Sequence, residues 1–201
     1  MRLLCGKLRE AVAKSETYPS YHGELLGILF EVQPRITLEA MCGGEQRELD
    51  LGIRILDEAS RFGLHPFDKI AEEVLLSWCD EAPGIRYAAV AGSVTPVELI
   101  GAPGQTQWRS VARRLLDRAP DRQAVLKCFM EKFTPWSWRD SRAGIIQSNL
   151  RLLEGLTGYT DPQLLEFINE QKARLHEEIQ NATQTDDLIL RIERESDERF
   201  E

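Results

Sequence analysis

The sequence predicts an all-α chain, an α-solenoid of antiparallel helical hairpins with about eight or nine helices. Three prolines, Pro83, Pro120 and Pro162, each stand shortly after an aspartate and lie 37 and 42 residues apart. An interval of about 40 residues is typical of stacked two-helix repeats. Apolar residues recur at helical spacing along most of the chain, and no stretch alternates convincingly with period two. Because a solenoid supplies binding surface, this fold class favours recognition over catalysis.

The first 63 residues are expected to form helices over about 4–12, 21–32 and 45–61, with a short helical turn at 36–41. Apolar side chains at helical spacing mark each helix. The inward face of the second helix is expected to carry Leu25, Leu26, Leu29 and Phe30. Pro34 and Gly63 are read as the stops of the second and third helices.

Pro66 is expected to start one continuous helix, because proline suits a first turn. Its inward positions would be Phe67, Ile70, Ala71, Val74, Leu75 and Trp78. A short alanine-rich helix over 85–93 and an irregular stretch over 94–105 follow. Thr106 is then expected to cap a helix that points Trp108, Val111, Ala112 and Leu115 inward.

The C-terminal part is expected to hold helices after Pro120, from Asp140 or Ser141 to about Leu156, and from Pro162 with Asp161 as its cap. The chain turns polar from Gln180 onward and ends in a charged run. We therefore expect a single helical-repeat domain over 1–180 and a charged extension over 181–201 that frays at the terminus.

The composition excludes several classes of protein. The formal net charge of −8 argues against a nucleic-acid partner, since phosphate neutralisation dominates that affinity. The cysteines form no CxxC pair and have no histidine at ligand spacing, so they are read as reduced thiols in a cytoplasmic protein; they are Cys5, Cys42, Cys79 and Cys128. Charges interrupt the apolar N-terminal run, and no stretch approaches the roughly 20 apolar residues of a membrane span.

No motif with a known chemistry stands out. The chain lacks a phosphate-binding glycine loop, an EF-hand and a metalloprotease helix. Cys79 is followed by two acids, which raise the pKa of a thiol and make it less reactive. The three histidines, His22, His65 and His176, are far apart in the sequence. We therefore predict no catalytic residue, no metal ligand and no cofactor, and a chain that is not an enzyme.

The candidate partner-binding residues come from two runs rich in tryptophan and arginine. They are Trp136, Trp138, Arg139 and Arg142, followed by Arg109 and Arg113. Trp and Arg are the residue types that carry interface energy. The run over 136–142 is also compatible with tryptophans that fill the space between two repeats, or with an anion site at a helix start. The second, with Arg114 and Arg118, is compatible with a solvated face that pairs with acids.

Two runs of the chain resemble known protein families. The run Pro83-Gly84-Ile85-Arg86-Tyr87-Ala88-Ala89 resembles the HEAT-type pattern at the start of a second repeat helix, within residues 66–179. The run from Trp136 to Ile146, with Asp161-Pro162 and the ending Asp197-Glu198-Arg199-Phe200-Glu201, resembles the C-terminal HEAT-like region of large bacterial proteins. Some of these are NTPases and other multidomain proteins of anti-phage defence. The resemblance implies a region that binds partners or senses a trigger while another domain supplies the activity.

We therefore expect a non-catalytic protein–protein interaction or sensing module, either a part or a stand-alone relative of a bacterial defence protein. Its partners would be proteins, with no nucleic acid and no membrane; the sequence leaves its oligomeric state open. One alternative is a small acidic immunity protein that captures a toxin, which a clustered acidic face would favour. A second is an enzyme whose site assembles in space, which a pocket joining a histidine to an acid would favour.

Overall fold

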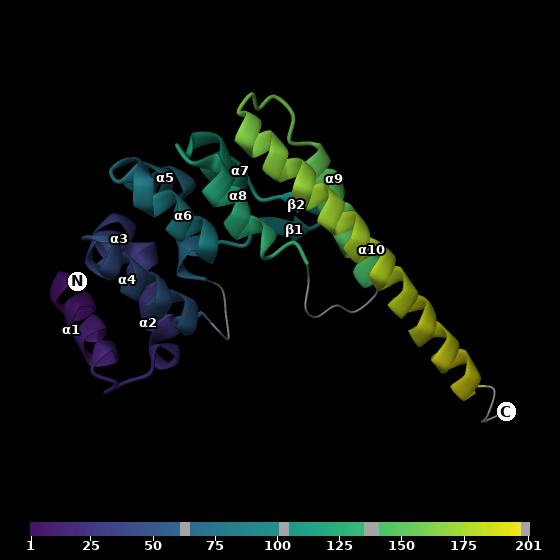
Figure 1. Cartoon of the computed structure of the whole chain (residues 1–201). Coiled ribbons are helices and arrows are strands. Elements are labelled where there is room, and N and C mark those ends of the chain that lie inside the picture. Colours follow the sequence, from purple (N-terminus) through teal and green to yellow (C-terminus); the bar gives the residue numbers. More distant parts are fainter. Residues whose placement is uncertain (61–64, 101–104, 135–140, 198–201) are drawn as a thin grey trace. The chain divides into compact units, whose positions relative to one another are not determined.

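The computed structural model describes residues 1–60, 65–100, 105–134 and 141–197. Within these ranges the chain is mostly helical, with ten α-helices, two short 3₁₀ helices and one pair of short strands (Figure 1). The predicted helical class is confirmed, whereas the solenoid of hairpins stays a prediction. The expected number of eight or nine helices is too low, partly because the predicted turn at 36–41 is a full helix.

Contacts between Cα atoms divide the chain into two compact units. Unit 1 comprises Met1–Val94 and Val111–Val125, and unit 2 comprises Thr95–Ser110 and Leu126–Glu201. The boundary that we predicted at residue 180 lies inside the last helix. The assignment of one domain and an extension stays a prediction.

The regular elements of unit 1 in its described residues are all helices. Its elements are α1 (Arg2–Ala13), η1 (Pro19–His22), α2 (Gly23–Val32), α3 (Pro34–Cys42), α4 (Gln46–Ala59), η2 (Pro66–Lys69), α5 (Glu72–Asp80), α6 (Pro83–Ser93) and α7 (Ser110–Arg118), followed by the start of α8 (Arg122–Met130). Pro34 and Pro83 occupy the first turns of α3 and α6, where their missing N–H costs nothing.

Helix α4 lies at the centre of unit 1 and contacts α1, α2, α3, α6 and η1. It buries Leu49, Ile55 and Leu56 completely. Gly52 sits between them on the same helix, and a Cβ atom there would lie 2.1 Å from the carbonyl oxygen of Met41. The backbones of α3 and α4 therefore approach one another at a position where only glycine fits.

Two predictions for unit 1 are wrong. The segment after Pro66 is not one helix, because η2 ends at an extended residue, Ile70, before α5 begins. The His65 side chain accepts a hydrogen bond from Phe67 N at 3.1 Å, which closes this short turn separately. Leu25, predicted to face inward, is exposed, because α2 turns Leu26 and Phe30 into the core instead.

Unit 2 contains a strand pair that we did not predict. β1 (Val97–Leu99) and β2 (Thr106–Trp108) are antiparallel, with Glu98 opposite Gln107. The expected irregular stretch over 94–105 is therefore wrong at Val97–Leu99, and the expected helix start at Thr106 is wrong; residues 101–104 lie outside the described residues. Contacts with a later helix, α9 (Arg142–Glu154), explain the extended conformation: Thr106 Oγ1 donates to Asn149 Oδ1 at 2.8 Å, and Trp108 Nε1 donates to the Leu152 carbonyl at 3.2 Å.

The core of unit 2 gathers around Trp108. Its ring lies 5.9 Å from that of Phe129 and 5.3 Å from that of Phe133, measured between centroids. α10 (Pro162–Asp197) packs antiparallel to α9 (Figure 1). The predicted caps of both helices are confirmed: Ser141 Oγ accepts from Gly144 N at 3.0 Å, and Asp161 Oδ1 accepts from Gln163 N at 3.0 Å.

Candidate functional site

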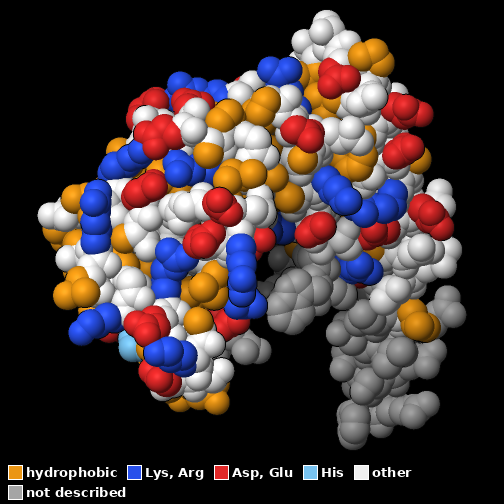
Figure 2. Space-filling model, turned by 60° about the vertical axis from the view of Figure 1, so that its left-hand side comes forward, with side chains coloured by type: hydrophobic (Ala, Val, Ile, Leu, Met, Phe, Trp, Pro, Cys, Tyr) orange, Lys and Arg blue, Asp and Glu red, His pale blue; other side chains and the backbone are white. Residues whose placement is uncertain are grey.

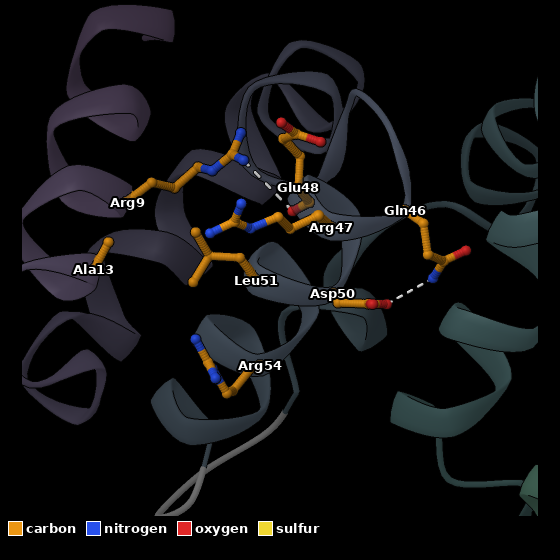
Figure 3. A pocket seen from close by; sticks show the side chains of 8 residues that line it. All are labelled: Arg9, Ala13, Gln46, Arg47, Glu48, Asp50, Leu51 and Arg54. Atoms are coloured by element: carbon orange, nitrogen blue, oxygen red, sulfur yellow. Dashed lines mark hydrogen bonds between the residues drawn. The ribbon is translucent and has the colours of Figure 1, made fainter.

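A pocket of about 910 Å³ lies between α1 and α4 in unit 1 (Figure 3). We call it the arginine pocket, because three of its lining residues are arginines. The lining residues are Arg9, Ala13, Gln46, Arg47, Glu48, Asp50, Leu51 and Arg54. Its volume lies at the upper end of the range of roughly 300–1,000 Å³ that is usual for small-molecule sites.

Helical spacing places two of the three arginines together. Arg47, Leu51 and Arg54 stand at positions i, i+4 and i+7 of α4, so they share one face of that helix. Arg9 reaches this face from α1 (Figure 3). It donates from Nη1 to the Ala40 carbonyl at 3.3 Å and, more weakly, from Nη2 to the Glu48 carbonyl at 3.5 Å. Neutral backbone oxygens therefore hold the Arg9 guanidinium in place.

The three guanidinium groups carry positive charge that no carboxylate in the described residues neutralises at close range. None of them has a carboxylate oxygen within 4.0 Å among those residues. Asp50, which also lines the pocket, accepts a hydrogen bond from Gln46 Nε2 at 2.7 Å (Figure 3). The arrangement can therefore bind an anion through several guanidinium groups at once.

A second surface of unit 1 is apolar and exposed, and we call it the α2 outer face. It consists of Leu25, Ile28 and Val32, which stand at positions i, i+3 and i+7. Two exposed tyrosines, Tyr18 and Tyr21, precede it in the sequence and pack edge to face, with ring centroids 5.9 Å apart. Because α2 also buries its opposite face, it is apolar on both sides, which is typical of a covered helix.

The motif around Pro83 has a structural role. Arg86, buried in unit 1, donates to the Trp78 carbonyl at 2.8 Å and contacts Glu81 at 3.3 Å and Glu39 at 3.4 Å. Burial and the Asp80 hydrogen bond raise the pKa of the neighbouring Tyr87. The motif thus links α3, α5 and α6 and leaves Arg86 with little surface for a partner.

The arginines of α7 pair with acids of unit 1. Arg113 contacts Asp117 at 3.2 Å, Arg114 contacts Glu72 at 3.4 Å, and Arg118 contacts Asp80 at 3.8 Å. Arg114 also pairs with Glu73, which raises the pKa of its guanidinium. This pairing agrees with the alternative of a solvated, paired face. Arg109 lies just before α7, and a partner-binding role for Arg109 and Arg113 stays a prediction.

Three of the predicted binding residues, Trp136, Trp138 and Arg139, lie outside the described residues. The fourth, Arg142, is half-buried at the start of α9, with Nη2 3.9 Å from Glu178 Oε2 of α10. The neighbouring Ser141 donates to Asp186 Oδ2 at 2.8 Å. A partner-binding role for this run stays a prediction.

All four cysteines lie in the described ranges and have raised pKa values, whereas a nucleophilic thiol has a lowered one. Burial raises the pKa of the Cys42 thiol to about 12, and burial together with the charge of Asp80 raises the pKa of the Cys79 thiol to about 12. His65 accepts from Phe67 N through Nδ1, and its Nε2 lies 3.1 Å from Asp57 Oδ1, so both ring nitrogens have partners. No group of three His, Cys, Asp or Glu in the described ranges is placed to hold a metal ion.

Charges of both signs are mixed on the visible surface. Figure 2 shows Lys and Arg side chains interspersed with Asp and Glu over the face that it presents, with hydrophobic side chains between them. On this face, such mixing disfavours the capture of a basic partner through one acidic area. No helix in the described ranges has both the length and the apolar character of a membrane span.

A scan against protein-family models found no matching family, and searches of curated proteins and of solved structures found no match. The resemblance to HEAT-like regions of bacterial defence proteins therefore stays a prediction. The sequence analysis did not predict the arginine pocket. The spacing of Arg47 and Arg54 on an expected helix was a usable signal, whereas the contribution of Arg9 depends on the packing of α1 against α4.

Proposed function

We propose that this chain is a non-catalytic recognition module that binds an amphipathic helix of a protein partner on the α2 outer face. The observation that carries the proposal is the exposure of an apolar stripe on a helix whose other side is already buried. Ile28 is 55% exposed and Val32 is 67% exposed, while Leu26 and Phe30 are completely buried. Covering this stripe with apolar side chains removes it from water, which favours association.

The spacing and the charges of α2 define the partner. Anchors at i, i+3 and i+7 match the way an amphipathic helix presents its own apolar side chains. Glu24 and Glu31 lie on the same helix, and Glu31 pairs with Lys69 at 2.6 Å. A partner helix with Lys or Arg beside its apolar stripe therefore complements this surface.

Other features support a module without chemistry of its own. The four cysteines are buried or half-buried and form no disulfide, as in a protein of a reducing cytoplasm. The arginine pocket contains no histidine, which leaves the alternative of a histidine-based enzyme site without support there. The place of the module in bacterial defence rests on the sequence resemblance alone.

The test compares the partner proteins that bind to the wild type with those that bind to an Ile28→Glu/Val32→Glu variant. Both positions are exposed, so we expect the variant to fold, which circular dichroism checks. A Leu99→Glu variant is a control for the effect of a glutamate at an exposed apolar residue outside this face, because Leu99 is such a residue of unit 2. We expect a protein that binds the wild type and the control but not the variant, and whose binding segment is an amphipathic peptide with basic flanks.

Two results would overturn the proposal. The first is a partner that binds the Ile28→Glu/Val32→Glu variant as tightly as the wild type. The second is a wild type that light scattering shows to be a dimer and that the same substitutions convert to a monomer. That outcome would assign the α2 outer face to a second copy of the chain.

A further inference from the structure

We propose that the arginine pocket binds a small molecule that carries phosphate groups and is larger than inorganic phosphate. The inference concerns α1 and α4 and does not rest on the proposed role of the α2 outer face. Its basis is the meeting of Arg9, Arg47 and Arg54 at one pocket of about 910 Å³.

The charge of the lining residues identifies the chemistry of the ligand. Three guanidinium groups face a common space, and the described residues offer them no carboxylate within 4.0 Å. An anion in this space relieves the mutual repulsion of the three cations. The planar guanidinium fork matches phosphate oxygens in pairs, so three arginines suit a ligand with many phosphate oxygens.

The spacing of the arginines indicates more than one anionic group. Arg47 and Arg54 are seven residues apart on α4, so their Cα atoms are separated by roughly 10 Å along the helix axis. A diphosphate, or a phosphate at each end of a small molecule, spans such a separation better than a single ion. The pocket volume also exceeds the space that one phosphate fills.

The remaining lining residues suit the other parts of such a ligand. Leu51 lies between the two arginines of α4, and Ala13 lies opposite on α1, so apolar contact is offered beside the guanidinium groups (Figure 3). The carboxylates of Glu48 and Asp50 also line the pocket. Arg9 is already held by two backbone carbonyls, which reduces the ordering that binding requires.

The test is calorimetric titration of the full chain with inorganic phosphate, pyrophosphate and ADP. An Arg47→Gln/Arg54→Gln variant removes two of the cations, and glutamine keeps the helix propensity of these exposed positions. The matched control is Arg2→Gln/Arg151→Gln, which makes the same change in net charge at exposed positions that do not line the pocket. We expect pyrophosphate or ADP to bind more tightly than inorganic phosphate, and the pocket variant to bind roughly 10- to 100-fold more weakly than the control.

Three results would overturn the inference. One is the absence of saturable binding of all three probes to the wild type. Another is equal weakening in the pocket variant and the control, which would indicate non-specific attraction by net charge. The third is tighter binding of a polyglutamate peptide than of pyrophosphate, which would assign the arginine pocket to an acidic protein segment. The Ile28→Glu/Val32→Glu variant should bind the phosphate probes as the wild type does.

Discussion

The Arg86 guanidinium lies 4.1 Å from the centroid of the Trp78 ring, and the same side chain donates a 2.8 Å hydrogen bond to the Trp78 backbone carbonyl. Trp78 Nε1 in turn donates to Glu39 Oε2 at 3.0 Å, and Arg86 contacts the same carboxylate oxygen. One arginine of α6 thus holds an aromatic side chain of α5 and an acid of α3. Arg86 and Trp78 are both buried, which strengthens these contacts.

Replacing Arg86 by methionine should therefore destabilise unit 1. The change keeps most of the side-chain volume but leaves the Trp78 carbonyl without this donor and removes the cation from the ring. We expect the free energy of unfolding to fall by about 2–3 kcal/mol, measured by urea denaturation. Arg2→Met, at an exposed position of α1, is the control and should stay within about 0.5 kcal/mol of the wild type. An Arg86→Met variant as stable as that control would contradict the structural role.

The close approach of α3 and α4 predicts opposite effects of the same substitution at two glycines. Gly52→Ala places a methyl group 2.1 Å from the Met41 carbonyl oxygen, so the helices must separate. We expect a loss of about 2–4 kcal/mol in the free energy of unfolding. Gly84→Ala on α6 meets no atom within 4 Å and should stabilise the chain by up to about 1 kcal/mol. Equal effects at the two sites, measured by thermal or urea denaturation, would mean that the helices are not in close contact.

Asn149 holds three segments of unit 2 together and should be difficult to replace. It is buried, donates from Nδ2 to the Phe133 carbonyl at 2.8 Å, and accepts from Thr106 Oγ1 at 2.8 Å. Asn149→Leu leaves both partners without this hydrogen bond, and we expect a loss of about 2–3 kcal/mol in urea denaturation. Gln147→Leu, at an exposed position of the same helix, is the control. Equal stability of the two variants would exclude this role.

Two buried thiols predict a loss of stability at alkaline pH. Burial raises the pKa of Cys42 and Cys79 from 9.0 to about 12, so the unfolded chain ionises these thiols first. Their contribution is fully present below pH 9 and decreases as the pH rises towards 12. Between pH 9 and pH 10.5 we expect a decrease of up to about 2 kcal/mol per thiol in the free energy of unfolding.

The matched measurement uses a Cys42→Ala/Cys79→Ala variant. It should be less stable than the wild type at pH 8, because two small cavities form. Its stability should then depend less steeply on pH between 9 and 10.5, whereas a Cys128→Ala variant keeps more of the wild-type slope. Parallel slopes for all three proteins would show that other groups govern the alkaline transition.

Local signals in the sequence predicted much of the helical structure. Pro83 and Pro162 begin helices because proline fits a first turn, and Asp161 and Ser141 cap helices through hydrogen bonds to residues two or three positions away. The strand at Thr106 could not be predicted in this way. Its hydroxyl contacts Ser148 and Asn149, more than 40 residues later in the chain, and that pairing exists only after α9 has packed.

Local sequence signals also failed to predict the long-range contacts of the candidate sites. The arginines of α7 could be read as a paired face, but their partners Glu72, Glu73 and Asp80 had to come from the fold. Leu25 fits the inward stripe of a helix equally well in either of two rotations. The structure selects the rotation that buries Leu26, and this leaves Leu25 on the α2 outer face.

The division of the chain has a consequence for its synthesis on the ribosome. Unit 1 is built from two stretches of sequence, and the second, Val111–Val125, follows the strand pair of unit 2. Arg114 and Arg118, which pair with acids of α5, belong to that second stretch. The ribosome makes the strands before α7. The first stretch of unit 1, up to Val94, is therefore synthesised before the α7 helix that completes its contacts. A truncated protein that ends at Val94 would leave these acids without their arginine partners.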